Sequence, residues 1–215
     1  MRRRYFLIVF ASVSLFMTGR LSFAGEPVLD GPESATQSLL SWYDQNIPAV
    51  YKATCPLIVH ELTETAMLDY INSGSGAHSR KKANVKDSDD IDGVFDNNPP
   101  RIAVELGDDG LADTSTFAHE YGHYVWFDLM DKSDRKAYER IYKHSKDRKA
   151  LVSDYAYENV EEGFAEAFSF YTNEPQELQR LDPDSYEFLA NWNEGISPLS
   201  PQSAKSSTSP SGRGE

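Results

Sequence analysis

The chain has 215 residues and carries 34 acidic side chains against 21 basic ones, which gives a net charge of −13. This length predicts one domain with one sizeable core, and the negative charge excludes a protein that binds nucleic acid or anionic membranes through a basic face. Cys55 is the only cysteine, which excludes an internal disulfide.

Residues 1–24 have the pattern of an export signal. Arg2–Arg4 precede the apolar stretch Tyr5–Met17, and Ser22–Ala24 has the small residues that favour cleavage. The stretch is short for a membrane span, which favours a cleaved signal over an N-terminal anchor, and the short basic segment favours the general secretory route over the twin-arginine route. Removal of this signal takes away four arginines and no acid, which leaves 17 basic against 34 acidic side chains and a net charge of −17.

The first part of the mature chain is predicted to form a helix, a strand and a second helix. Apolar residues recur at helical spacing over Glu33–Ala53, where Pro48 ends the helix early. Cys55–His60 has the pattern of a strand, and Thr63 begins a short helix that runs through Ile71. We expect the first helix to cover a sheet.

Residues 72–100 are predicted to form a long loop, because they hold several glycines and few apolar side chains. The acidic run Asp87–Asp92 resembles a calcium loop, but Ile91 stands where a third oxygen ligand is needed. A solvated segment is therefore favoured over a calcium-dependent surface module. The following Arg101–Leu106 is predicted to be a strand, either internal or at a sheet edge to which an extended peptide could add.

A helix predicted over Thr116–Met130 contains His119-Glu120-Tyr121-Gly122-His123, with Asp113 or Thr114 as its cap. Residues four apart share a helical face, so the two imidazoles can bind one metal ion while Glu120 is free to act as a base. Two histidines do not complete a catalytic zinc site, which usually has three protein ligands. The metzincin continuation is absent, because Trp126 and Leu129 occupy the positions of its glycine and histidine.

The third ligand is expected from a helix predicted over Asn159–Thr172, since the remaining histidines, His60, His78 and His144, lack ligand spacing. Spacing alone does not choose among its acidic candidates, which are Glu158, Glu161, Glu162 and Glu166. Glu162 and Glu166 share a face bordered by small residues, so this face can lie against another helix. There a cation and a histidine N–H could be the partners that two inward-facing carboxylates need.

The remaining segments indicate helices and a tail. A polar helix is predicted over Asp134–His144, and helices over Pro175–Trp192 are interrupted near Pro183. Residues 197–215 are rich in Ser, Pro and Gly and are predicted to be disordered. The predicted architecture is α+β: a small twisted sheet, an active-site helix and a helical C-terminal part, together in a domain at 25–196.

The motif, Tyr155 and, seven residues on, Glu162 within Glu-Gly-Phe-Ala-Glu-Ala-Phe resemble the protease domain of anthrax lethal factor. They resemble still more the small secreted Pro-Pro endopeptidases of that family, and the likeness runs from Arg101 to Trp192. It implies a zincin-like fold of the gluzincin type, with one zinc ion per chain. The zinc ligands that it implies are His119, His123 and Glu162.

The resemblance further implies that Glu120 is the general base and Tyr155 a catalytic phenol. It makes Glu166 the hydrogen-bond partner of a histidine and places Glu161 beside the substrate groove. Two positions depart from the family: Gly163 replaces an aromatic residue, and no tryptophan precedes Arg101 in the loop where the secreted relatives use one to shape the Pro-Pro groove.

The expected function is that of a secreted zinc metalloendopeptidase, extracellular or periplasmic and monomeric. Zinc lowers the pKa of water and polarises the scissile carbonyl, Glu120 moves the proton, and Tyr155 donates to the oxyanion. The expected substrate is an extracellular or envelope protein, cut at a proline-containing site. The alternative is an exported binding module that keeps the fold and the zinc without turnover, against which the intact Glu120 and Tyr155 argue.

Overall fold

A computed structural model of the chain describes residues 26–53, 57–72 and 91–194. The predicted signal peptide at 1–24, the predicted tail at 197–215, Cys55, His78 and most of the acidic run at 87–92 lie outside these residues. Within the described ranges, no helix is long and apolar enough to cross a membrane.

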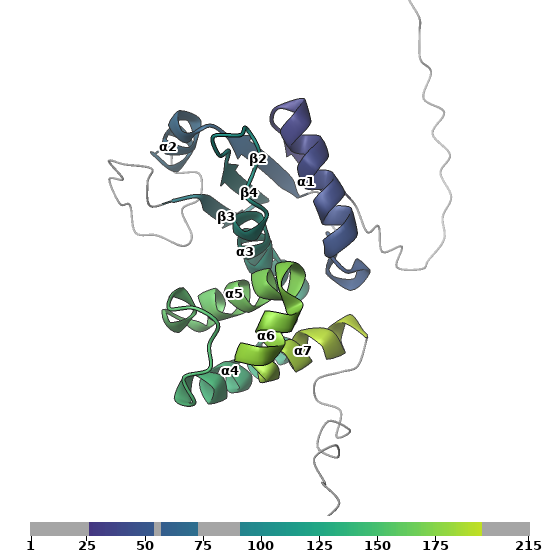
Figure 1. Ribbon diagram of the computed structural model, residues 1–215, viewed down its shortest axis with the longest axis vertical. Helices are drawn as coiled ribbons and strands as arrows, with labels where there is room; N and C mark the ends of the chain where they lie inside the picture. The colour runs from purple at the N-terminus through teal and green to yellow at the C-terminus, as the bar shows by residue number, and fades with distance from the viewer. Residues whose placement is uncertain (1–25, 54–56, 73–90, 195–215) are drawn as a thin grey trace, which may run out of the picture.

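The upper part of the molecule is built on a mixed sheet of four described strands, in the order β1-β2-β4-β3 (Figure 1). The strands are β1 (Val28–Asp30), β2 (Ile58–Leu62), β3 (Gly93–Asn97) and β4 (Pro100–Glu105). β1, β2 and β4 run parallel to one another, whereas β3 is antiparallel to β4. β4 is therefore an internal strand, and β3 lies beside it at the end of this strand order.

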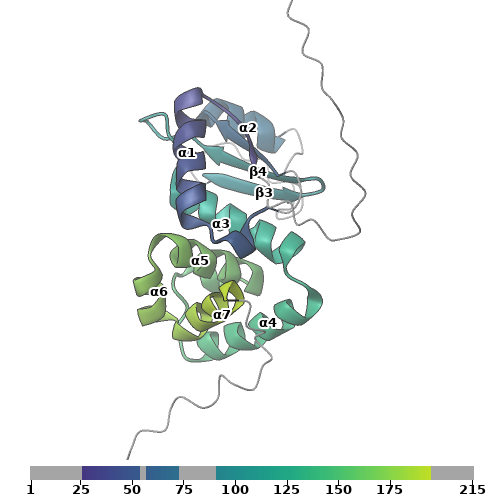
Figure 2. The same ribbon diagram turned by 90° about the vertical axis from the view of Figure 1, so that its right-hand side faces the viewer.

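The helices divide between the sheet and a separate helical layer. They are α1 (Glu33–Asn46), α2 (Glu64–Asn72), α3 (Thr114–Tyr124), α4 (Lys132–Asp147), α5 (Val160–Asn173), α6 (Pro175–Leu181) and α7 (Pro183–Asn193). Two short 3₁₀ helices, η1 (Ala49–Tyr51) and η3 (Tyr155–Tyr157), and the π-helical turn η2 (Val125–Leu129) complete the described helical elements. α4 to α7 form the lower part of the molecule, and α3 lies between this part and the sheet (Figures 1 and 2).

The sheet is covered on both faces. In β4 alternate residues point to opposite faces: Ile102 and Val104 join the main core with α1 and α3, whereas Ala103 packs with Met67 of α2 and Ile91. All three β4 residues are fully buried, as expected for a central strand with helices on both sides. This packing fixes α3 against the sheet.

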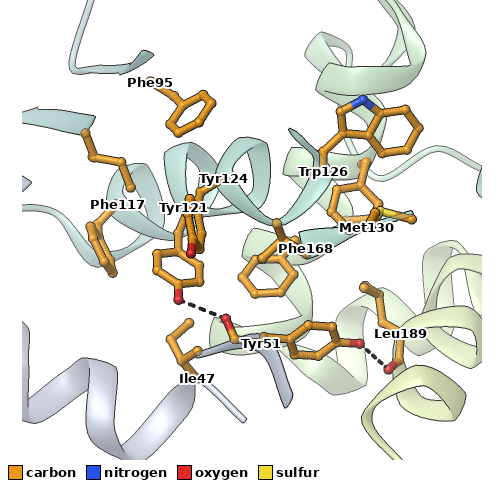
Figure 3. Packing of buried hydrophobic residues seen from close by; sticks show 14 of the residues in the cluster. Ile47, Tyr51, Phe95, Phe117, Tyr121, Tyr124, Trp126, Met130, Phe168 and Leu189 are labelled. Carbon is orange, nitrogen blue, oxygen red and sulfur yellow. Dashed lines mark hydrogen bonds between the residues drawn. The ribbon is translucent and has the colours of Figure 1, made fainter. Parts of the chain in front are cut away.

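Tyr51 joins the two parts of the core (Figure 3). Its hydroxyl donates to the carbonyl of Leu189 in α7 at 2.5 Å, and its own carbonyl accepts from the hydroxyl of Tyr121 in α3 at 2.8 Å. Its ring also packs edge-on against Phe168 of α5, with 5.3 Å between the ring centroids. The segment after α1 therefore connects α3, α5 and α7.

The predicted α+β class is confirmed, and so are the helix that ends before Pro48 and the break at Pro183. The prediction that 72–100 is loop throughout was wrong, because β3 lies within it. β3 contains Gly93, Asp96 and Asn97, residues that are depleted in strands, so its composition conceals it. Of the two alternatives for Arg101–Leu106, the internal strand holds and the sheet edge was wrong, since β3 covers that side.

Candidate metal centre

The helix α3 presents the two histidines of the motif on its side toward α5. Asp113 caps its N-terminus by accepting from the backbone N–H groups of Ser115 and Thr116. Phe117 and Tyr121 point into the main core, which fixes the rotation of the helix about its axis. His119 and His123, one turn apart, then face the helical layer, with 4.9 Å between their ring centroids.

The helix α5 brings two carboxylates to the same place. Asn159 caps it by accepting from the backbone N–H groups of Glu161 and Glu162, so the first turn that carries Glu162 is held in helical geometry. α3 and α5 approach closely where Gly122 faces Ala165: a Cβ at Gly122 would lie 2.8 Å from the Cα of Ala165. Ala165, one of the small residues predicted to allow another helix to approach, therefore lies at the contact between α3 and α5.

His119, His123 and Glu162 form a cluster of candidate metal ligands, with their ligand atoms within 4.8 Å of one another. Glu162 Oε2 lies 3.2 Å from Nε2 of His119 and 3.2 Å from Nε2 of His123. Tetrahedral zinc with bonds of about 2.0–2.1 Å separates its ligand atoms by about 3.3 Å. The donor set and its spacing thus fit one zinc ion.

The charges around this cluster favour a bound cation. Burial alone would raise the pKa of Glu162, but its hydrogen bonds with His119 and His123 outweigh burial and hold the pKa well below its usual range. Burial lowers the pKa of His119, yet its hydrogen bonds with Glu162 and Glu166 outweigh burial and raise the pKa to about 10. Without metal the carboxylates hold a proton on the imidazole. Three carboxylates, Glu120, Glu162 and Glu166, lie near two imidazoles, an excess of negative charge that a divalent ion can balance.

The two histidines are oriented in different ways. Glu166 Oε1 lies 2.7 Å from Nδ1 of His119, which directs the other ring nitrogen toward Glu162. Nδ1 of His123 is buried and has no hydrogen-bond partner among the described residues. Instead, the ring of Phe95 in β3 stacks on His123, with 6.4 Å between centroids and 19° between planes. Packing therefore holds the second imidazole.

A cavity of about 330 Å³ opens beside the cluster, between the start of β3, α3 and α5. Glu120 and Tyr155 both line it, together with His119 and Glu166. Tyr155 lies in η3, and its ring is tilted 40° from that of His119 at a centroid distance of 5.6 Å. The arrangement places a carboxylate and a phenol beside a metal-binding cluster in one hollow.

Gly93 allows β3 to approach the motif helix. A Cβ on Gly93 would lie 2.8 Å from Cγ and 2.9 Å from Oε1 of Glu120, and 2.8 Å from Cγ2 of Thr116. Any larger residue would have to displace the Glu120 side chain or move the strand away. The backbone of β3 and the carboxylate of Glu120 therefore adjoin the same cavity.

The model of the family described as anthrax toxin lethal factor, N- and C-terminal domain, matches residues 37–192. The chain belongs to the lethal factor family. The match begins within α1 and ends within α7, so it includes the strands β2 to β4 and the helical layer. No curated protein shows significant sequence similarity to the chain.

A solved structure supports the family's fold for this chain. The Pro-Pro endopeptidase PPEP-2 from Paenibacillus alvei superimposes with a TM-score of 0.54 at 20% sequence identity. The superposition covers 78% of this chain and 97% of that one. At this identity the likeness shows the fold, which is the predicted zincin-like α+β architecture.

Most residues predicted for the lethal factor-like site are brought together by the structure: His119, Glu120, His123, Tyr155, Glu162 and Glu166. Glu161 is half-buried next to Glu162 but is not among the residues that line the cavity. His60 and His144 lie elsewhere, paired with Asp30 and Asp184.

The site also contains contacts that the sequence pattern did not indicate. Gly163, which departs from the family, faces the ring of Tyr142; a Cβ there would lie 2.4 Å from Cε2 of that ring. An aromatic ring from α4 thus fills the space beside Gly163. Gly93 and Ser153 were also missed: a glycine in a supposed loop and a serine two residues before Tyr155 carry no spacing signal.

Proposed function

We propose that this protein is a zinc-dependent endopeptidase. The observation that carries the proposal is the cluster of His119, His123 and Glu162 with Glu120 and Tyr155 in the adjoining cavity. A hydrolytic zinc site needs these parts: three protein ligands, a base and an oxyanion donor. The family match and the fold shared with a Pro-Pro endopeptidase support the same activity.

One zinc ion per chain, held by His119, His123 and Glu162, supplies Lewis acidity toward water and the scissile carbonyl. Glu120 accepts a proton from the attacking water and passes it to the leaving amine. The hydroxyl of Tyr155 donates to the oxyanion that forms at the carbonyl. Glu166 holds the tautomer of His119 in which Nε2 is free to ligate.

The substrate is proposed to be an extended protein segment that adds to the edge of the sheet. Among the described strands, β3 pairs only with β4, so its other side can pair with a peptide. That side begins at Gly93, directly beside Glu120. An extended backbone on β3 would thus bring a peptide bond to the base, with Glu161 beside the groove.

The proposal extends to the location of the enzyme, its substrates and its oligomeric state. With residues 1–24 as a cleaved signal, the enzyme is secreted or periplasmic, and its substrates are extracellular or envelope proteins. Cleavage at a proline-containing site is proposed because the similar solved structure is named a Pro-Pro endopeptidase. The net charge of −17 that remains after loss of this signal supports a monomer that binds neither nucleic acid nor anionic membranes.

Digestion of a proteome-derived peptide library by the wild-type protein and by Glu120→Gln tests the proposal. We expect cleavage by the wild type with one zinc per chain, and a rate lower by about 100- to 10,000-fold for the variant with its zinc retained. The exposed Glu158→Gln is the matched control and should cleave at the wild-type rate. The flanking residues of the cut sites report any preference for proline.

Two results would contradict the proposal. A folded wild-type protein with one zinc and no cleavage would indicate the alternative, an exported binding module. If metal analysis found calcium and no zinc, the protein would have no zinc centre.

A further inference from the structure

Ser153 connects the metal cluster to the segment that carries Tyr155. Its hydroxyl donates to Oε2 of Glu166 at 2.5 Å, and its oxygen accepts from the backbone N–H of Ala156 at 3.1 Å. The same Glu166 uses its other oxygen, Oε1, for His119. One serine thus contacts both α5 and the 3₁₀ helix η3.

Each hydrogen bond from Ala156 through Ser153 to Glu166 has one donor and one acceptor. A hydroxyl has one proton, and Ser153 gives it to Glu166, so its oxygen is left to accept from Ala156. Glu166 then accepts from both sides, from Ser153 and from His119.

Both neighbours of this serine belong to the proposed mechanism. Glu166 orients His119, and its side chain is only 18% exposed, so a lost hydrogen bond would leave a largely buried oxygen unpaired. Tyr155 stands between Ser153 and Ala156, and its ring lies 5.6 Å from that of His119. If the hydroxyl were absent, Glu166 could rotate and the first turn of η3 would lose its anchor.

We infer that Ser153 is a positioning residue that sets His119 and Tyr155 in a fixed relation through Glu166 and the N–H of Ala156. This inference rests on the proposed function for its effect on turnover, but its effect on metal binding is independent of any activity. The hydrogen bonds of Ser153 go to Glu166 and Ala156, and Ser153 is not one of the candidate metal ligands. Its role is to limit the rotation of Glu166 and the movement of η3.

Ser153→Ala tests the inference through two measurements. Zinc affinity, measured by competition with a chelator, should weaken by about 10-fold, within the range for groups that orient metal ligands. kcat should fall by about 10-fold with little change in KM, because Tyr155 is displaced rather than the substrate-binding edge. Ser153→Thr keeps the hydroxyl and should restore both values.

Ser145→Ala is the matched control. Ser145 also donates to a carboxylate, Asp182, at 2.6 Å, but this bond joins α4 to the start of α7. Its loss should change stability and leave zinc affinity and kcat at the wild-type values. Amide hydrogen exchange at Ala156 in the zinc-free protein should accelerate in Ser153→Ala and stay unchanged in Ser145→Ala.

Double-mutant cycles separate positioning from a general loss of structure. In the Glu166→Gln background Ser153→Ala should weaken zinc binding by less than about twofold, and in the Tyr155→Phe background it should lower kcat less than in the wild type. Wild-type zinc affinity and kcat in Ser153→Ala, or fully additive effects in both cycles, would overturn the inference.

If Ser153→Ala does not fold, Ser153→Cys, which keeps the size with a weaker donor, gives the same measurements. A wild type that binds zinc but cleaves nothing would refute the proposed function, while chelator competition would still decide the role of Ser153.

Discussion

Gly93 is the residue at which the sheet edge meets the proposed base. The missing side chain lets β3 lie against α3, and the nearest atoms to its absent Cβ belong to Glu120 and Thr116, at 2.8 Å. Glycine weakens a strand because it has no side chain to pack, so a glycine at the start of β3 is a local cost. A residue with a side chain would not fit where the strand lies this close to Glu120.

Gly93→Ala should therefore reduce catalysis without removing the metal. The added methyl group pushes against the Glu120 side chain, and a small misplacement of a catalytic group costs about 100-fold in rate. kcat/KM on a cleaved peptide and zinc content should be measured together, with Gly107→Ala as control. A Cβ on Gly107 would lie 3.4 Å from its nearest neighbour, an ordinary contact. Full activity in Gly93→Ala would show that β3 does not constrain Glu120.

At the scale of elements, the site depends on how α5 begins. Asn159 accepts from the backbone N–H of Glu162 at 3.0 Å, so the cap and the metal ligand belong to the same turn. α4 begins in the same way, with Asp131 accepting from the N–H groups of Ser133 and Asp134. The two caps share their hydrogen-bond pattern and differ in whether a metal ligand follows.

Asn159→Ala is expected to lower the free energy of unfolding by about 1 kcal/mol and to weaken zinc binding, because the first turn of α5 frays. Asp131→Ala should also destabilise its helix but leave zinc affinity unchanged. Chemical unfolding of the zinc-free proteins and chelator competition give the two quantities. Equal zinc affinity in Asn159→Ala and the wild type would show that packing alone places Glu162.

The elements that could be predicted are those whose signals are local. The motif helix and α5 each combine a capping residue with an apolar face, and Pro48 and Pro183 end or interrupt helices at the predicted places. β1 has three residues, too few for a periodic pattern, and three of the five residues of β3, Gly93, Asp96 and Asn97, are of types depleted in strands. The contacts of Gly93 with Glu120 and of Ser153 with Glu166 join different elements, so no spacing along the chain could indicate them.

For the whole molecule, one buried carboxylate links stability to pH. Glu61 of β2 is 3% exposed, and neither of its carboxylate oxygens has a hydrogen-bond partner among the described residues. Burial raises its pKa from 4.5 to about 7. Between these values the folded protein holds a proton that the unfolded chain has released, so the free energy of unfolding falls as pH rises through this window.

The contribution of Glu61 to this slope is at most about 1.4 kcal/mol per pH unit. Glu61→Gln cannot ionise, so relative to the wild type it should gain stability from pH 4.5 to pH 7 and keep that gain at pH 8. Urea unfolding across this range measures the difference, and the exposed Glu187→Gln should show no such trend. A constant difference between Glu61→Gln and the wild type would mean that Glu61 is paired when folded.

The bond from Tyr51 to Leu189 spans 138 residues of sequence, and β1 pairs with β2 only across the length of α1. Contacts between such distant segments cannot form until both have been synthesised, and they slow folding because a long loop must close first. The core around Tyr51 therefore cannot be completed until α7, the last described helix, has left the ribosome. Completion of this core therefore depends on a segment that lies 138 residues further along the chain than Tyr51.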